Sequence, residues 1–211
     1  MLWSAIVSPR LPRSLLCVLV VAAAVLAVAA PASAPVGAPP DVLVVGDSLV
    51  RGVTPYLSAD LGEDVAWDIS AGRPTPDGLL ALRAALTRLH PRAIVISLGT
   101  NDSGDPRRFA PRVRRALDMA PATACVVWST IFRPHRKGPS AGLNRVLRRA
   151  AARDPRLVLV EWRRAVLRGL VPLRPDGLHP LDAGYRYRSL MIAHAVRARC
   201  GAPTGLAAPL I

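Results

Sequence analysis

The chain has 211 residues, of which 51% are hydrophobic and 20% charged, so its composition suits one globular domain and excludes a disordered chain. Its formal net charge is +14, and every basic residue except Lys137 is an arginine. These arginines are spread over several predicted helices, whereas nucleic-acid-binding proteins gather basic and aromatic side chains on one surface. We therefore expect a monomer that binds no nucleic acid and associates weakly with anionic membrane or wall surfaces.

The N-terminal segment, residues 1–34, has the pattern of an export signal. Arg10 and Arg13 precede the apolar run Leu15–Ala30, and small residues suited to cleavage follow it. This pattern predicts a cleaved signal peptide, with an N-terminal membrane anchor as the alternative. Residues 35–40 form a Pro/Ala linker. From the signal pattern we expect the protein to be exported and to lie outside the cytoplasm.

From residue 41 onward, short apolar runs alternate with helical patterns. The predicted strands are Val42–Val45, Val65–Ile69, Ala93–Gly99, Cys125–Ser129 and Leu157–Val160. The predicted helices are Leu49–Leu61, Pro76–Leu89, Arg107–Met119, Leu143–Ala152 and Leu181–Arg199. Strands separated by helices predict a mainly parallel five-stranded sheet in a three-layer α/β domain over residues 41–200, followed by a tail at 201–211.

Two cysteines lie inside the predicted domain. Cys125 and Cys200 are far apart in the sequence, and an exported chain meets an oxidising environment in which a disulfide forms. The alternative is that Cys125, within the apolar run "ACVVWS", is a small buried residue. The sequence leaves both alternatives open.

Ligands of parallel α/β sheets bind beyond the carboxyl ends of the strands, so the polar residues there are candidate site residues. Ser48 directly follows the first strand and supplies a hydroxyl nucleophile. His179 is the best candidate base, and Asp176 stands three residues before it, close enough to orient the imidazole. Ordinary turn and helix-capping roles are the alternative for each residue taken alone.

Donors for a developing oxyanion follow the next two strands. The backbone N–H groups of Ser48 and Gly72 and the side-chain amide of Asn101 are the candidates. Glycine at position 72 lets the backbone approach a ligand closely.

Four motifs together resemble the SGNH, or GDSL, hydrolases: "GDSL" at Gly46–Leu49, a glycine at Gly72, "GTND" at Gly99–Asp102 and "DGLH" at Asp176–His179. The similarity covers about Asp41 to Arg199. It implies a flavodoxin-like three-layer α/β/α sandwich and ester or acyl-transfer chemistry without a metal. It also implies that Ser48 is the nucleophile, that Asp176 and His179 complete a triad, and that Gly72 and Asn101 are oxyanion donors.

Within the family, the chain is most similar to extracytoplasmic domains attached to membrane acyltransferases. We expect an exported serine esterase acting on short O-acyl groups of a small-molecule or glycan ester, without a cofactor or metal. One alternative is an O-acyltransferase that passes the acyl group to a cell-envelope glycan hydroxyl. The other is a non-catalytic basic domain that binds anionic envelope polymers.

Basic residues near the predicted site are candidates for substrate binding. Arg73 follows the second strand, and Arg133, His135 and Arg136 follow the fourth in "TIFRPHRKG". Their position predicts contact with an anionic substrate beside Ser48, and a solvated basic loop is the alternative.

Overall fold

The computed structural model describes residues 40–134 and 138–201. The predicted signal segment, the linker up to residue 39 and the tail from residue 202 lie outside these ranges, as do His135 and Arg136. Within the described ranges, no helix is both long enough and apolar enough to cross a membrane.

A five-stranded sheet forms the centre of the fold, and every pair of neighbouring strands is parallel. The strand order is β2-β1-β3-β4-β5. The strands are β1 (Val42–Gly46), β2 (Val65–Ile69), β3 (Ala93–Ser97), β4 (Cys125–Ser129) and β5 (Leu157–Val160). β1 and β3 are buried along their whole length, which explains their uninterrupted apolar sequences. The prediction of a mainly parallel sheet is confirmed.

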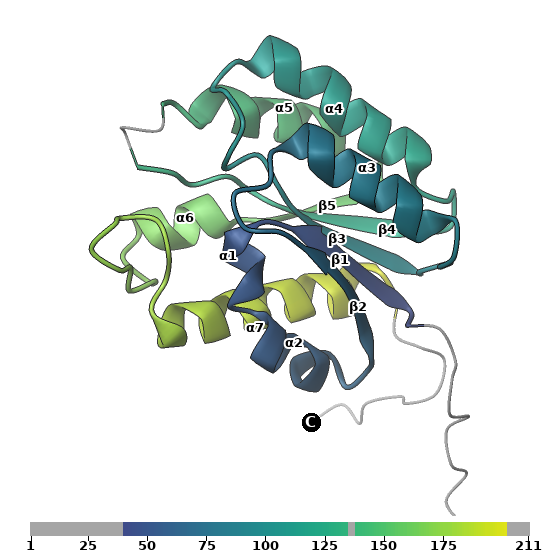
Figure 1. Cartoon of the computed structure of the whole chain (residues 1–211), viewed down its shortest axis with the longest axis horizontal. Helices are drawn as coiled ribbons and strands as arrows, with labels where there is room; N and C mark the ends of the chain where they lie inside the picture. Colours follow the sequence, from purple (N-terminus) through teal and green to yellow (C-terminus); the bar gives the residue numbers. More distant parts are fainter. Residues whose placement is uncertain (1–39, 135–137, 202–211) are drawn as a thin grey trace, which may run out of the picture. The chain divides into compact units, whose positions relative to one another are not determined.

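Helices cover both faces of the sheet and complete three layers (Figure 1). The helices are α1 (Ser48–Arg51), α2 (Thr54–Leu61), α3 (Thr75–Leu86), α4 (Pro106–Met119), α5 (Ala141–Ala151), α6 (Trp162–Leu167) and α7 (Asp182–Arg199). One face carries α3, α4 and α5, whose core includes Trp128 with Phe109 packed edge-on against it. The opposite face carries α2 and α7 around a second core that includes Leu57 and Ile192. The predicted α/β/α sandwich is confirmed.

Two helix predictions need correction. The single helix expected over Leu49–Leu61 is split into α1 and α2, because Gly52 caps the first helix and Pro55 lies in the first turn of the second. A Cβ atom on Gly52 would lie 2.5 Å from the ring of Tyr185, so α7 packs directly against this break. Helix α6 was not predicted, because six residues are too few to display a helical period.

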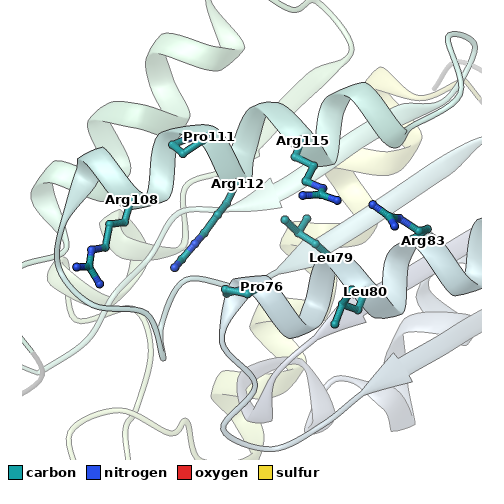
Figure 2. A pocket seen from close by; sticks show the side chains of 8 residues that line it. All are labelled: Pro76, Leu79, Leu80, Arg83, Arg108, Pro111, Arg112 and Arg115. Atoms are coloured by element: carbon teal, nitrogen blue, oxygen red, sulfur yellow. The ribbon is translucent and has the colours of Figure 1, made fainter.

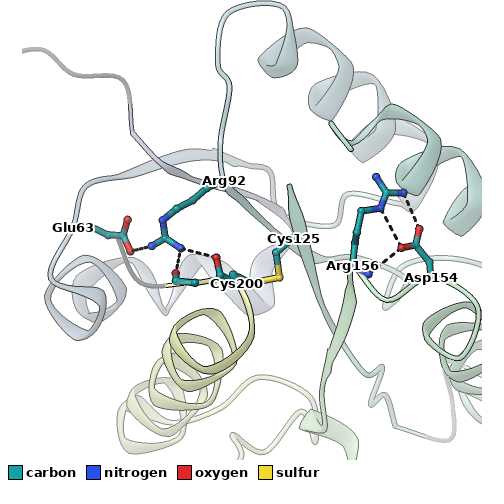
Figure 3. Close-up of a disulfide and its surroundings, with 7 residues drawn as sticks. Glu63, Arg92, Cys125, Asp154, Arg156 and Cys200 are labelled. Atoms are coloured by element: carbon teal, nitrogen blue, oxygen red, sulfur yellow. Dashed lines mark hydrogen bonds and ion pairs between the residues drawn. A yellow bond between two sulfur atoms is a disulfide. The ribbon is translucent and has the colours of Figure 1, made fainter. Parts of the chain in front are cut away.

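The amino end of the sheet is cross-linked (Figure 3). A disulfide joins Cys125, the first residue of β4, to Cys200 after α7, and this decides between the two alternatives left by the sequence. Arg92, just before β3, binds Glu63 and donates to the backbone carbonyl of Gly201 at 2.7 Å. These contacts fasten the end of α7 to the starts of the central strands.

A third cross-link at this end fastens α4 to β5. Arg156, just before β5, forms an ion pair with Asp154 at 2.7 Å. Its guanidinium also donates to the backbone carbonyls of Leu117 and Ala120, at the end of α4.

Candidate active site

The chain turns sharply from β1 into α1, and this turn presents Ser48. A Cβ atom on Gly46 would lie 2.4 Å from the Val50 side chain, so only glycine lets the strand end this close to α1. Asp47 caps the helix, since its Oδ1 accepts a hydrogen bond from the Leu49 backbone N–H at 3.0 Å. Ser48 is therefore the first residue of α1, at the carboxyl edge of the sheet.

A chain of hydrogen bonds runs from Ser48 to the "DGLH" segment. The Ser48 Oγ lies 2.9 Å from His179 Nε2, and His179 Nδ1 lies 2.5 Å from Asp176 Oδ2. Ser48 and His179 are 131 residues apart in the sequence, and the fold brings them into direct contact. The geometry is that of a nucleophile, a base and a carboxylate that orients the base.

The turn around Asp176 fixes the imidazole. Asp176 Oδ1 accepts the backbone N–H groups of Leu178 at 2.9 Å and His179 at 3.0 Å. The hydrogen bond to the His179 ring and these two N–H groups hold the pKa of Asp176 well below its usual range. The Asp176 side chain is therefore a carboxylate at neutral pH, as the orienting role requires.

The candidate oxyanion groups also meet at this edge. Gly72 has a left-handed backbone with φ 71°, and among the described residues other than Gly72 and its two chain neighbours, none has a heavy atom within 4 Å of the position that its Cβ would occupy. The Asn101 side-chain amide donates to Asp47 Oδ2 at 3.2 Å and to the Arg73 carbonyl at 3.3 Å. Asn101 thus joins the turn that carries Ser48 to the segment that carries Gly72.

A buried charge pair lies behind the Ser48 turn. Asp47 is fully buried, and this burial raises its pKa to about 6, although the Leu49 N–H and the positive charge of Arg188 act in the opposite direction. Burial also lowers the pKa of Arg188 to about 10, so it remains a cation at neutral pH. Arg188 donates to Ser97 Oγ at 3.0 Å, and the backbone carbonyl of Ser97 accepts the Asp47 backbone N–H at 3.2 Å. Sequence reasoning missed Arg188, which lies in an ordinary helical pattern.

Asp102 is a further residue whose role the sequence did not reveal. Its side chain is fully buried, and its Oδ1 accepts the Thr75 backbone N–H at 2.7 Å. Its Oδ2 forms an ion pair with Arg112 at 3.0 Å. Asp102 therefore fastens the Asn101 loop to the beginning of α3 and to the middle of α4.

The structure corrects the substrate-binding role expected for Arg133. Its guanidinium is buried and donates to backbone carbonyls, among them Asp102 at 2.6 Å, Thr100 at 3.4 Å and Pro139 at 3.0 Å. These contacts hold both neighbours of Asn101 in place, so Arg133 presents no free cation to a substrate. The expectation fails because the sequence could not show that this loop folds back on the Asn101 loop.

Arg73 is also held by groups of the protein itself, and its predicted contact with substrate stays a prediction. Its guanidinium donates to the Asp68 carboxylate and to the Asp68 carbonyl, both at 2.7 Å, and its side chain is only 12% exposed. It fastens the Gly72 loop to the end of β2. His135 and Arg136 lie outside the described residues, so their predicted role stays a prediction. Among the residues that the structure describes, no group of three or more His, Cys, Asp or Glu side chains is placed to hold a metal ion.

The three-layer fold, together with a serine, a histidine and a carboxylate at its carboxyl edge, defines a serine hydrolase that acts on carboxylic esters. A family model agrees, since the GDSL-like lipase/acylhydrolase family matches residues 44–187 of the 211-residue chain. The chain belongs to this family, and the expected SGNH (GDSL) resemblance is confirmed.

Solved structures of the same fold include esterases and acylhydrolases. TesA is 27% identical, with a TM-score of 0.61 over 74% of this chain and 98% of TesA. The lipase/acylhydrolase from Enterococcus faecalis is 20% identical, with a TM-score of 0.64 over 78% of this chain and 98% of that enzyme.

The catalytic domain of an acyltransferase is also among the similar structures. The C-terminal catalytic domain of Streptococcus pneumoniae peptidoglycan O-acetyltransferase A is 17% identical, with a TM-score of 0.64 over 77% of this chain and 96% of that domain. At this identity the likeness concerns the fold. A search of the curated proteins found no match.

Proposed function

We propose that this protein is an exported serine esterase that hydrolyses short O-acyl esters through an acyl-enzyme on Ser48. The observation that carries the proposal is the hydrogen-bonded chain from Ser48 Oγ through His179 to Asp176. Acyl transfer needs a hydroxyl, a base within hydrogen-bond reach of it and a group that orients the base. Each of these requirements has a candidate at one edge of the sheet.

In the first half of the reaction, Ser48 Oγ attacks the ester carbonyl carbon while His179 Nε2 takes the hydroxyl proton. The carbonyl oxygen becomes an oxyanion, which accepts hydrogen bonds from the N–H groups of Ser48 and Gly72 and from the Asn101 amide, whose 3.3 Å hydrogen bond to the Arg73 carbonyl it replaces. The C–O bond to the leaving alcohol then breaks, and the imidazolium returns its proton to the departing oxygen. Asp176 stabilises the transient positive charge on His179.

In the second half, a water molecule attacks the acyl-Ser48 carbonyl carbon and gives its proton to His179. The bond to Ser48 Oγ breaks, the proton returns to this oxygen, and the carboxylic acid leaves. A sugar hydroxyl that replaced water would complete an acyl transfer by the same steps. The similar fold of the pneumococcal O-acetyltransferase domain favours this second candidate function enough to test it.

Export is part of the proposal because two features support it. The first is the signal-like pattern over residues 1–34, and the second is the Cys125–Cys200 disulfide, a bond that persists in oxidising compartments. Mass spectrometry of the protein recovered outside the cytoplasm should show a new N-terminus between Ala30 and Pro35. An intact Met1 in the membrane fraction would contradict cleavage.

The central test compares wild-type protein with Ser48→Ala on p-nitrophenyl acetate, butyrate and octanoate. We expect the acetate and butyrate esters to turn over fastest and Ser48→Ala to lose kcat by more than about 10⁴-fold. Ser70→Ala, which changes an exposed serine directly after β2, is the matched control and should keep full activity. A serine-directed phosphonate should label Ser48 alone. Turnover by Ser48→Ala at the wild-type rate would overturn the proposal.

A second assay separates hydrolysis from transfer. The wild-type protein is supplied with p-nitrophenyl acetate and increasing chito-oligosaccharide, and free acetate and acetylated sugar are both measured. A hydrolase releases free acetate at every acceptor concentration. A predominance of acetylated sugar would make the protein a transferase.

A further inference from the structure

A cleft lined by arginines lies between α3 and α4, outside the Ser48 site (Figure 2). Its cavity volume is about 380 Å³. Its lining consists of four arginines and four apolar residues: Arg83, Arg108, Arg112, Arg115, Pro76, Leu79, Leu80 and Pro111. We call it the arginine cleft.

The sequence spacing explains why these residues face one another. On α3 the lining positions are 76, 79, 80 and 83, and on α4 they are 108, 111, 112 and 115. Steps of three and four residues place side chains on one face of a helix, so each helix turns one such face to the cleft. Figure 2 shows Arg83 and Arg115 reaching from opposite helices toward each other.

The positive charge of the cleft is only partly balanced. Arg112 forms an ion pair with Asp102 at 3.0 Å, and Arg108 lies 3.8 Å from Asp105. In the described part of the chain, no carboxylate oxygen lies within 4 Å of Arg83 or Arg115. A guanidinium pairs readily with phosphate or carboxylate, so two of them across a cleft suit an anionic ligand.

The neighbouring cavity between α4 and α5 provides an internal comparison. It is larger, at about 590 Å³, and it also contains three arginines, Arg114, Arg149 and Arg153. Its lining includes two carboxylates, Asp118 and Asp154, whereas the lining of the arginine cleft includes none. The two cavities thus differ in lining charge, with four arginines and no carboxylate in the arginine cleft against three arginines and two carboxylates in the neighbouring cavity.

The arginine cleft lies next to the two loops that carry the oxyanion candidates Gly72 and Asn101. Asp102 directly follows Asn101, and its side chain binds both Arg112 inside the cleft and the backbone N–H of Thr75 at the start of α3. Thr75 in turn stands three residues after Gly72. One end of the cleft, at Pro76 and Arg108, therefore lies at the beginnings of α3 and α4, which follow the carboxyl ends of β2 and β3.

We propose that the arginine cleft binds the anionic groups of a glycan whose acyl ester reaches Ser48. This inference rests on the proposed esterase function and specifies its substrate class, an acylated glycan that carries phosphate or carboxylate groups. None of the eight lining residues is aromatic, whereas non-specific nucleic-acid sites stack bases on aromatic rings. A cleft enclosed by two helices also suits a narrow polymer better than a flat membrane surface.

The binding test uses the full chain carrying Ser48→Ala, so that its outcome does not depend on turnover. The probes are an oligogalacturonate, which carries carboxylates, and a phosphorylated mannan, which carries phosphates, with neutral dextran as the uncharged reference. Arg83→Gln/Arg115→Gln should weaken binding of at least one anionic probe by tenfold or more at low salt. The probe that binds more tightly shows whether the cleft prefers carboxylate or phosphate groups.

The matched control is Arg149→Gln/Arg153→Gln, which removes the same charge from exposed positions at the neighbouring cavity. It should weaken binding less than twofold, and thermal unfolding should show that both double variants are folded. Equal losses in the two variants would overturn the proposal, because the effect would then come from net charge alone. Stronger binding of single-stranded DNA or phosphatidylglycerol vesicles than of either glycan would also overturn it.

A kinetic test in the active protein separates this inference from the proposed function. The Arg83→Gln/Arg115→Gln variant should hydrolyse neutral p-nitrophenyl acetate like the wild type and lose at least fivefold in kcat/KM on O-acetylated oligogalacturonate or mannan phosphate. Equal kcat/KM values for wild type and variant on both acylated glycans would overturn the inference while leaving the esterase function intact. Loss of neutral-ester turnover in Ser48→Ala tests the esterase function separately.

Discussion

The two ends of the parallel sheet are held in different ways. At the amino end, the Cys125–Cys200 disulfide and the Arg92–Glu63 ion pair join elements to one another (Figure 3), and Arg156 joins β5 to α4 through hydrogen bonds to backbone carbonyls. At the carboxyl end, buried polar groups such as Asp47 and Asp102 hold loops whose half-buried side chains, such as Asn101, are arranged for chemistry. The contacts at the amino end join structural elements, whereas those at the carboxyl end position the candidate site residues, and each end buries a carboxylate whose pKa is raised by that burial.

We therefore expect stability and chemistry to depend on different ends of the sheet. Changes at the amino end should lower the free energy of unfolding and leave kcat unchanged. Changes at the carboxyl end should lower kcat with smaller effects on stability. The following predictions test this separation, from the largest expected effect in free energy to the smallest.

The largest effect on kcat is expected from replacing His179, the proposed base. His179→Ala should lower kcat on p-nitrophenyl acetate by about 10⁵-fold, because His179 Nε2 is the base that contacts Ser48 Oγ. Asp176→Asn should cost less, since an amide still partly orients the ring. Both variants should unfold near the wild-type temperature. His194→Ala, an exposed histidine on α7, is the control and should keep full kcat. Equal activity of His179→Ala and His194→Ala would contradict the assignment.

The second prediction concerns the disulfide at the amino end of the sheet. Replacing Cys125 and Cys200 together by alanine opens a link across 75 residues, and the loop-entropy relation predicts a loss of about 4 kcal/mol in the free energy of unfolding. Urea denaturation of the variant and of the oxidised wild type measures the loss. At 25 °C, well below unfolding, kcat should stay within twofold. A large fall in kcat of the folded variant would show that the two ends are coupled.

Asn101→Ala tests the oxyanion side of the carboxyl end. We expect kcat to fall by about 10²-fold with little change in KM, because the amide hydrogen bond strengthens in the transition state. Ser103→Ala, which changes an exposed serine two residues later in the same loop, is the control. A change in KM alone would assign Asn101 to substrate binding.

The smallest effect concerns the free-energy cost of burying the charged Asp47 side chain in the folded protein. Burial raises its pKa from 3.8 to about 6, so the native state binds this proton more tightly than the unfolded chain. The stability that results is fully present below pH 3.8 and is lost as the pH rises through about 6.

Relative to Asp47→Asn, the wild-type free energy of unfolding should therefore fall by on the order of 2 kcal/mol between pH 4 and pH 7. Urea denaturation of both proteins at the two pH values measures the difference. An unchanged difference would show that the Asp47 carboxylate carries no burial cost. Asp47→Asn should also lower kcat, because its new amide N–H groups face the donor Nδ2 of Asn101.

Much of the fold was predictable from the sequence because short runs rich in apolar and β-branched residues predict strands. Runs such as Val65–Ile69 and Cys125–Ser129 match the observed strands, and parallel pairing follows from the helices between them. The motifs around Ser48, Asn101 and His179 follow strands or precede a helix, so their meeting at one edge was also predictable. The sequence thus determined the layers, the sheet direction and the candidate site.

Only the tertiary structure decided how the polar groups are paired. Arg133 was expected to face substrate, yet it holds the carbonyl of Asp102, which is 31 residues away. The link between Asn101 and Asp47, the bond between Cys125 and Cys200, and the facing arginines of the cleft likewise join distant segments. A local sequence pattern predicts a helix or strand and which of its faces is buried. It does not predict which distant group a charged side chain contacts. That choice is made by the packing of loops and helices around the finished sheet.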